Sequence, residues 1–164
     1  MLHAVCPLGD LKPSNILVNE DLTVVKISDF GLARFLAEPE ASALPKGGTP
    51  AFMAPEVLHA IGSLPISTAC DIFALGATLF CMLVGSPPWM GATQLDLAGN
   101  LTKFELTFPS EIEPINPHLR HLLHRLLEKD PEERIQLRDV LIHEWVTAEG
   151  SEIILLDIKT CLVG

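Results

Sequence analysis

One stretch of the chain, residues 67–85, reads STACDIFALGATLFCMLVG and is apolar on nearly every face of the helix it would form. Ser67 is a residue type that favours a helix start, and Gly85 is one that favours a helix end. The uninterrupted apolar part, residues 72–84, is too short to cross a bilayer and directly follows Asp71. We therefore predict a buried core helix around which a domain is organised, and no membrane partner.

The length and charge of the chain limit what this helix can belong to. A chain of 164 residues is long enough for one domain with a real core. Hydrophobic residues make up 48% and charged residues 20%, which is ordinary for a globular protein and unlike a disordered or fibrous one. The formal net charge of −10 argues against nucleic acid as a partner, because such binding needs clustered Lys and Arg.

The cysteines and the chain ends indicate a reducing compartment. Cys6, Cys70, Cys81 and Cys161 have neither metal-ligand nor C-x-x-C spacing. The first residues lack the cationic start and apolar run of a secretory signal, so we expect a cytoplasmic location. The final CLVG has the form of a prenylation signal, but Gly is an unusual last residue and no polybasic segment precedes it. Lipidation is therefore not expected.

The rest of the chain predicts a small hairpin and three more helices. The runs NILV and LTVVKI flank a turn-prone NED and predict a hairpin over residues 15–27. Further helices are predicted at residues 54–60, from Asn116 with Pro117 in the first turn, and at about 137–146. The second of these carries a helical stripe of apolar side chains, Leu119, Leu122, Leu123, Leu126 and Leu127.

Four polar residues near the start of the chain have an order that suits phosphoryl transfer. Asp10, Lys12 and Asn15 lie within six residues, and Asp29 follows the predicted hairpin. A carboxylate can accept a proton, an ammonium can neutralise a phosphoryl group, and an amide oxygen with a second carboxylate can bind Mg²⁺. Each residue alone would be read as a turn or cap residue. Only their joint order favours a catalytic interpretation.

These residues belong to a longer series of motifs that resembles the protein kinase family. The motifs are DLKPSN at 10–15, SDFGLA at 28–33, GTPAFMAPE at 48–56, DIFALG at 71–76, GSPPW at 85–89, KDPEERI at 129–135 and HEW at 143–145. The resemblance implies a mainly α fold, the C-terminal lobe of a kinase with a short β hairpin at the cleft. It further implies a kinase-domain fragment over residues 1–147 and a tail over 148–164.

The resemblance implies an ATP and Mg²⁺ site with a role for each residue. Asp10 would accept the proton of the substrate hydroxyl, Lys12 would neutralise the transferring phosphoryl group, and Thr49 would help to orient Asp10. Asn15 and Asp29 would hold the magnesium ion. Lys12 also favours Ser/Thr over Tyr substrates, so the implied activity is that of a serine/threonine-protein kinase.

Other residues would have binding or structural roles. Leu17 would form the floor under the adenine ring. Glu56 and Arg134 would form a buried ion pair that fixes the activation segment, and Asp71 would anchor the catalytic loop through its backbone. The structural residues that the resemblance implies are Phe30, Gly31, Glu56, Asp71 and Arg134.

The motifs GTPAFMAPE and HEWVT most resemble those of the calcium/calmodulin-dependent protein kinase kinases. The resemblance implies that the protein substrate is another kinase, phosphorylated on a threonine of its activation loop. The residues after Trp145 are acidic and contain one Lys, whereas calmodulin targets are basic amphipathic helices. Calmodulin is therefore not expected to bind this chain.

Two departures from the kinase pattern affect the expected activity. Leu8 and Gly9 stand where the family has His-Arg, so this loop lacks the cation that would read a phosphorylated activation segment. Nine residues precede Asp10, so the N-terminal lobe, with its Gly-rich loop and strand Lys, is expected to be absent. We expect the isolated chain to be nearly inactive. The alternative is a non-catalytic remnant of the lobe that acts as a protein-binding scaffold.

A metal site formed by histidines is a further alternative. His118, His121 and His124 are spaced three apart, so they drift around the helix axis, and a solvated polar face is the favoured interpretation. His143 and Glu144 lack the second His of a zinc-hydrolase helix.

Overall fold

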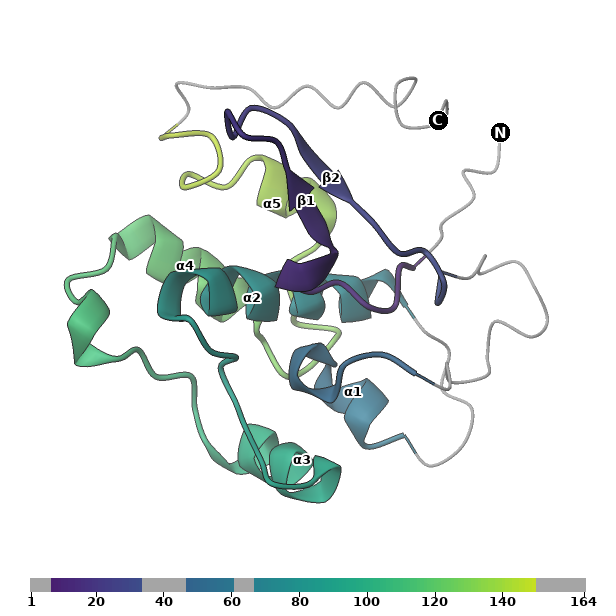
Figure 1. Cartoon of the computed structure of the whole chain (residues 1–164). Coiled ribbons are helices and arrows are strands. Elements are labelled where there is room, and N and C mark those ends of the chain that lie inside the picture. The colour runs from purple at the N-terminus through teal and green to yellow at the C-terminus, as the bar shows by residue number, and fades with distance from the viewer. Residues whose placement is uncertain (1–6, 34–46, 61–66, 150–164) are drawn as a thin grey trace.

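The computed structural model describes residues 7–33, 47–60 and 67–149. In this part of the chain, helices gather around a long central helix and a two-stranded hairpin rises from one side of it (Figure 1). The elements are η1 (Pro13–Asn15), β1 (Ile16–Val18), β2 (Val25–Ile27), η3 (Pro50–Phe52), α1 (Pro55–Leu58), α2 (Thr68–Val84), α3 (Gln94–Lys103), η4 (Ser110–Ile112), α4 (Pro117–Leu126) and α5 (Leu137–Leu141). The expected mainly α fold with a short hairpin is confirmed.

The central helix α2 is the apolar stretch that the sequence singled out. It ends at Gly85, whose φ of 86° is left-handed and suits glycine. Ser67 occupies the N-cap position as expected, but its side chain makes no capping hydrogen bond. The predicted N-cap position is therefore confirmed.

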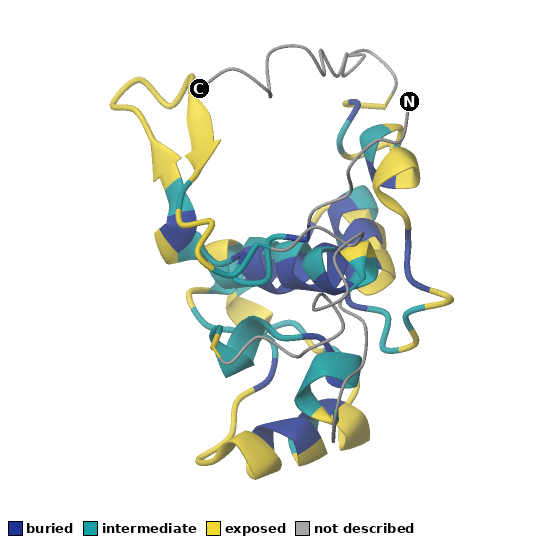
Figure 2. Cartoon of the chain, turned by 90° about the vertical axis from the view of Figure 1, so that its right-hand side faces the viewer, coloured by how far each residue is buried: buried dark blue, intermediate teal, exposed yellow. Residues whose placement is uncertain are grey.

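Because α2 is apolar all round, it supports a separate core cluster on each of two faces. One cluster joins Phe73 and Phe80 to the region of α3, where Trp89 and Leu97 are buried. The other cluster joins Ile72 to α4 and α5, and its buried members are Ile72, Leu122, Leu126, Ile135 and Val140. Figure 2 shows the buried colour concentrated along α2, which is the common centre of both clusters.

The predicted hairpin is present as an antiparallel pair. Its register places Ile16 opposite Ile27, Leu17 opposite Lys26 and Val18 opposite Val25. The turn is closed by Asn19, whose Oδ1 accepts hydrogen bonds from the backbone N–H groups of Thr23 (2.9 Å) and Val24 (2.8 Å). Most of the hairpin is exposed in Figure 2, so its strands depend on each other and on η1 more than on the core.

Helix α4 also forms as the sequence predicts. The Oδ1 atom of Asn116 accepts hydrogen bonds from the backbone N–H groups of His118 (2.9 Å) and Leu119 (3.1 Å). The leucines of the predicted stripe are all buried. They pack so closely on α2 that a Cβ atom added at Gly76 would lie 2.7 Å from the Leu126 Cβ atom.

Three helices differ from the sequence prediction. Helix α1 covers only Pro55–Leu58 of the predicted residues 54–60, and its first residue is the expected proline. Helix α5 ends at Leu141, and residues 144–149 form turns, so the prediction of a helix to residue 146 is wrong. Helix α3 was not predicted, although Thr93 and Asp96 form a capping box at its start, with the Thr93 Oγ1 atom accepting from the Asp96 N–H.

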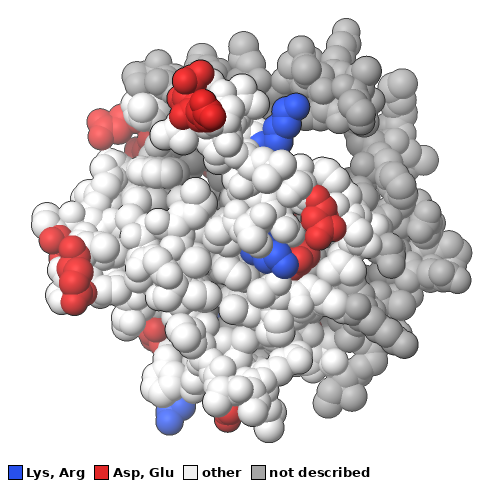
Figure 3. All heavy atoms as spheres, in the orientation of Figure 1, with Lys and Arg blue, Asp and Glu red and all other residues white. Residues whose placement is uncertain are grey.

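Several expectations concern properties of the surface and of the chain ends. No helix in the described ranges is long and apolar enough to cross a membrane. Cys70 and Cys81 are free thiols, whereas Cys6, Cys161 and most of the predicted tail (150–164) lie outside the described residues. On the face shown in Figure 3, acidic and basic side chains are scattered among uncharged ones.

The close approach of α2 and α4 predicts opposite effects for two Gly→Ala changes. Gly76→Ala should lower the free energy of unfolding by about 1–3 kcal/mol, because the added methyl group overlaps Leu126 and Leu127. Gly99→Ala in α3 is the matched control, because a Cβ atom there meets nothing within 4 Å. It should raise stability by up to about 1 kcal/mol through helix propensity. Urea unfolding of both variants measures the difference, and equal effects would contradict this packing.

Candidate active site

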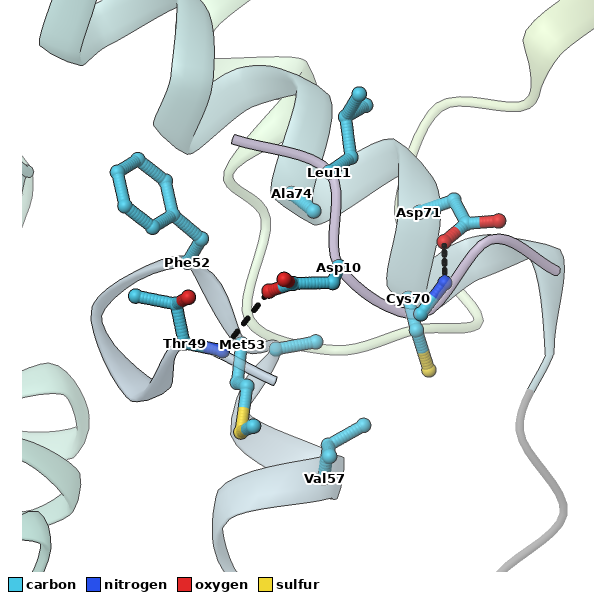
Figure 4. Close-up of a pocket in the computed structure, with 11 residues that line it drawn as sticks. Asp10, Leu11, Thr49, Phe52, Met53, Val57, Cys70, Asp71 and Ala74 are labelled. Atoms are coloured by element: carbon cyan, nitrogen blue, oxygen red, sulfur yellow. Dashed lines mark hydrogen bonds between the residues drawn. The ribbon is translucent and has the colours of Figure 1, made fainter. Parts of the chain in front are cut away.

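The loop that leads to Asp10 is fixed to the core helix by one carboxylate. Asp71, in the first turn of α2, accepts hydrogen bonds from the backbone N–H groups of Leu8 (2.7 Å, to Oδ2) and Gly9 (3.1 Å, to Oδ1). Figure 4 shows the Asp71 side chain directed at this backbone. Burial raises the pKa of the Asp71 carboxyl, and the two N–H donors lower it in part.

The turn at this anchor depends on a glycine. Gly9 has a φ of 79°, in the left-handed region that other residues rarely adopt. A Cβ atom there would also lie 3.3 Å from both the Cβ and the carbonyl oxygen of Leu32. Gly9, which the sequence showed only as a departure from the family pattern, therefore lets the chain turn between the Asp71 anchor and Asp10.

Asp10, Lys12 and Thr49 form a single hydrogen-bonded group. The Lys12 ammonium donates to the Asp10 Oδ2 atom (2.6 Å) and to the Thr49 Oγ1 atom (2.7 Å). The Thr49 backbone N–H donates to the Asp10 Oδ1 atom at 2.9 Å, as Figure 4 shows. The two carboxylate oxygens thus face the side chain of Lys12 and the backbone of a segment almost forty residues away in sequence.

These contacts set the charge of Asp10. Burial raises the pKa of its carboxyl, but hydrogen bonds from Lys12 and Thr49, together with the Lys12 charge, outweigh this effect. The pKa of Asp10 is consequently lowered from its ordinary value. Asp10 is therefore a carboxylate at neutral pH, which is the form that can accept a hydrogen bond or a proton from a hydroxyl group.

Asn15 joins the same group from the end of η1. It is buried, with 8% of its surface exposed, and its amide nitrogen donates to the Asp10 backbone carbonyl (2.9 Å) and the Asp10 Oδ2 atom (3.4 Å). Its backbone carbonyl accepts from the Ser28 N–H at 2.8 Å, across the base of the hairpin. Asn15 therefore connects the catalytic loop to the strand end that precedes Asp29.

Asp29 lies at the same end of the hairpin but is not bonded directly to this group in the described residues. It has a φ of 62°, and its Oδ1 atom accepts a hydrogen bond from the Gly31 N–H at 3.1 Å. Phe30, between them, has 59% of its surface exposed. The structure thus brings Asp10, Lys12, Asn15 and Thr49 into contact and bonds Ser28, which precedes Asp29, to Asn15.

Two side chains near the base of the hairpin have oxygen atoms of the kind that bind Mg²⁺. Because the Asn15 amide nitrogen faces Asp10, its amide oxygen is the end left for a cation. Asp29 adds an exposed carboxylate. Mg²⁺ prefers such oxygen ligands and commonly keeps water or phosphate oxygens in its remaining positions. Leu17 lies on the strand that follows Asn15 with 56% of its surface exposed, so it offers an apolar surface near these ligands.

A second anchor fixes the segment that carries Thr49. Arg134, whose side chain is fully buried, donates to the Glu56 Oε1 (2.7 Å) and Oε2 (3.0 Å) atoms. Its other N–H groups donate to backbone carbonyls of Ala69 (2.8 Å), Glu128 (2.8 Å) and Lys129 (3.2 Å). All the donors of the guanidinium are therefore used. This pair holds the start of α1, and hence η3 and Thr49, against α2.

Two features of the site were missed in the sequence. A cavity of about 30 Å³ lies beside Asp10, and its lining includes Met53 and Cys70. Burial raises the pKa of the Cys70 thiol, which keeps it protonated. Thr78, the buried hydroxyl in the middle of α2, donates to the Leu11 carbonyl oxygen at 3.4 Å. A hydroxyl in the middle of an apolar helix is the sequence feature that could have predicted this second contact, between α2 and the loop that carries Asp10.

Comparison with known proteins identifies the arrangement. A model of the protein kinase domain matches residues 5–146. The chain belongs to the protein kinase family. The matched kinase region includes the hairpin, both anchors and every predicted site residue.

The relatives of this kinase chain are named as serine/threonine-protein kinases. GRIK2 of Arabidopsis thaliana is 36% identical over 145 residues, which cover 88% of this chain and 35% of that protein. Kinase ssp1 of Schizosaccharomyces pombe is 42% identical over 149 residues, which cover 86% of this chain and 22% of that protein. TOS3 of Saccharomyces cerevisiae is 36% identical over 161 residues, with 86% and 29% covered. The chain therefore spans about a third or less of each of these kinases.

The Glu56–Arg134 pair predicts a large effect of one substitution. Glu56→Ala should lower the free energy of unfolding by about 3–5 kcal/mol, because it leaves the buried Arg134 guanidinium without its carboxylate. The matched control is Glu105→Ala, which removes the carboxylate of an exposed pair with Lys129 (3.3 Å) and should change stability little. Chemical unfolding of both variants tests the difference. A loss at Glu56 no larger than at Glu105 would contradict a stabilising buried pair.

Proposed function

We propose that this chain contains the catalytic loop of a serine/threonine-protein kinase that transfers the γ-phosphoryl group of ATP to a protein hydroxyl. The observation that carries the proposal is the hydrogen-bonded group of Asp10, Lys12, Asn15 and Thr49, formed by two separate segments. Membership of the kinase family and the names of its relatives support the same reaction.

Asp10 is the catalytic base in this proposal. It is ionised at neutral pH, and the Thr49 N–H and the Lys12 ammonium fix its two oxygens. A substrate hydroxyl that donates to this carboxylate is oriented for attack and can pass its proton to it. The Lys12 ammonium, held between Asp10 and Thr49, balances negative charge that develops on the transferred group.

Asn15 and Asp29 are the proposed magnesium ligands. When bound, Mg²⁺ neutralises charge on the ATP phosphates. Asn15 is preorganised for its part, because its amide nitrogen and its backbone carbonyl are both engaged. Leu17 is the proposed contact for the adenine ring, while Phe30 and Gly31 are assigned to the loop that carries Asp29.

The substrate and subfamily are finer proposals. The motifs GTPAFMAPE and HEWVT support a place near the calcium/calmodulin-dependent protein kinase kinases. The proposed substrate is then a threonine in the activation loop of another kinase, in the cytoplasm. No calmodulin contact is assigned to this chain.

The 164 residues by themselves are proposed to transfer phosphate slowly. They include no Gly-rich loop and no strand Lys of the kind that kinases use to hold the α and β phosphates. If such contacts contribute even ~3 kcal/mol, ATP affinity without them falls roughly a hundredfold.

A scaffold without catalysis is the second candidate. It is favoured by the exposed apolar side chains of the hairpin and the following loop, where Leu17 has 56%, Val25 63% and Phe30 59% of its surface exposed. Such a surface is typical of a protein-binding site. A reading frame that continues upstream into a Gly-rich loop and a strand Lys would favour the kinase, and sequencing the full transcript decides this point.

The proposed nucleotide site can be tested by binding, without turnover. Titration of the isotopically labelled 164-residue protein with ATP and Mg²⁺ should shift the NMR signals of Asn15, Leu17 and Asp29. Asp29→Ala should abolish the Mg²⁺-dependent part of these shifts. Asp21→Ala, which removes an exposed carboxylate in the hairpin turn, is the matched control and should leave them unchanged. Shifts that persist in Asp29→Ala would contradict the assigned site.

The proposed weak transfer is tested separately with radiolabelled ATP and an activation-loop peptide. The 164-residue protein should give incorporation close to background, and Asp10→Asn should remove any that is present. Robust transfer that depends on Asp10 would overturn the proposal of low activity while supporting the assigned chemistry. Transfer that is unchanged in Asp10→Asn would overturn the role of this residue.

A further inference from the structure

A pair of histidines joins α4 to the residues that follow α5. The His121 Nδ1 and His143 Nε2 atoms are 2.8 Å apart, and the two rings are stacked with centroids at 5.1 Å and an interplanar angle of 19°. His121 was expected on a solvated face, and it is exposed. The fold brings it to His143, which lies 22 residues later in the sequence.

The hydrogen bonds around His143 determine which nitrogens carry protons. The Trp145 backbone N–H donates to the His143 Nδ1 atom at 3.2 Å, so that atom must be an acceptor. A neutral His143 then carries its proton on Nε2 and donates it to the Nδ1 atom of His121. The same logic requires a neutral His121 to carry its proton on Nε2.

A proton on His143 removes the Trp145 hydrogen bond but keeps the bond between the rings, and a second proton breaks that bond too. A proton added to His121 would occupy Nδ1 and face the N–H group of His143. A proton added to His143 would occupy Nδ1 and face the Trp145 N–H. Either change replaces a hydrogen bond by two opposed donors, and two charged rings at this distance would also repel each other.

The pair holds a segment that closes part of the core. The His143 carbonyl accepts hydrogen bonds from the Val146 N–H (2.8 Å) and the Thr147 N–H (2.9 Å), which folds residues 143–147 into a compact turn. Trp145 and Val146 line an apolar groove of about 210 Å³, whose other walls include side chains of α2 and α4. Release of the turn would therefore uncover apolar surface next to the second core cluster.

Other charged groups around the pair shift the pKa of His143 in opposite directions. From α4, the charge of His118 lowers the pKa of His143, whereas Glu144 beside it raises it. His118 is itself 2.8 Å from the Glu144 carboxylate and 3.7 Å from that of Glu149. The nearby helix α5 carries Arg138 and Asp139, which pair with each other at 3.7 Å.

The balance of these effects has a definite sign. Burial is the largest cause, the charge of His121 adds to it, and the pKa of His143 is lowered from its ordinary value. A histidine with a lowered folded-state pKa contributes stability above about pH 6.5. That stability is lost as the pH falls through the pKa that His143 has in the folded protein.

We propose that the His121–His143 pair is a pH-sensitive clasp. It holds residues 143–149 on α4 while at least one ring is neutral, and it releases them when both rings are protonated. The proposal does not depend on phosphoryl transfer, because none of these residues belongs to the candidate active site. No group of three His, Cys, Asp or Glu side chains that could hold a metal ion is found in the described ranges.

The clasp is tested by unfolding the 164-residue protein in urea at about pH 7.5 and about pH 5.5. The wild-type midpoint should fall at the lower pH. His143→Gln, which cannot take up a proton, should lose most of this fall. His124→Gln is the matched control, because His124 lies on the same helix but packs edge-on against Phe108, with ring centroids 5.8 Å apart. It should keep the full pH dependence.

A second measurement on the wild-type protein keeps the test independent of how the variants fold. NMR titration of the histidine ring signals should give a His143 pKa below about 6.5, with the Trp145 backbone signal changing over the same pH range. A His143 pKa at or above that value, or an equal fall of the urea midpoint in wild type and His143→Gln, would overturn the clasp. Tight Zn²⁺ binding that shifts both ring signals at about pH 7.5 would also overturn it, in favour of a metal site.

Discussion

The structure depends on one carboxylate that joins the loop before Asp10 to the central helix α2. Asp71 sits in the first turn of the most buried helix and holds the backbone of Leu8 and Gly9. Removing a carboxylate from water is unfavourable, and two N–H donors compensate for it only if the loop keeps this conformation. The position of Asp10 is therefore a consequence of how α2 packs.

The second half of the site is fixed by the same helix through a different contact. Arg134 connects Glu56 with the backbone of Ala69 just before the α2 residues that hold the loop. Thr49 can meet Asp10 and Lys12 because its own segment is fixed to α2 in this way. The hairpin packs less on the core, because its strands are mostly exposed and only Asn15, just before β1, is buried. The group around Asp10 and the hairpin thus differ in how firmly the described core supports them.

Much of this arrangement could be predicted from residue order. The apolar run of α2, the leucine stripe of α4 and the hairpin are local patterns, and the motif series gave the family. Three features could not be predicted in this way. The end of α5 at Leu141 is followed by the contact of His143 with the distant His121, and the left-handed turn at Gly9 is visible only once Asp71 is in place. The third is that Ser67 occupies the cap position of α2 without a capping hydrogen bond from its side chain.

The central proposal is that core packing places Asp10, Asn15 and Asp29 around one nucleotide and its metal ion. The most direct test is a crystal structure of the protein grown with Mg²⁺ and a non-hydrolysable ATP analogue. The account predicts that oxygens of Asn15 and Asp29 bind the ion, with the Asp10 carboxylate facing the terminal phosphate and Leu17 against the adenine. An ion held by other residues, or a nucleotide bound away from the hairpin base, would contradict it.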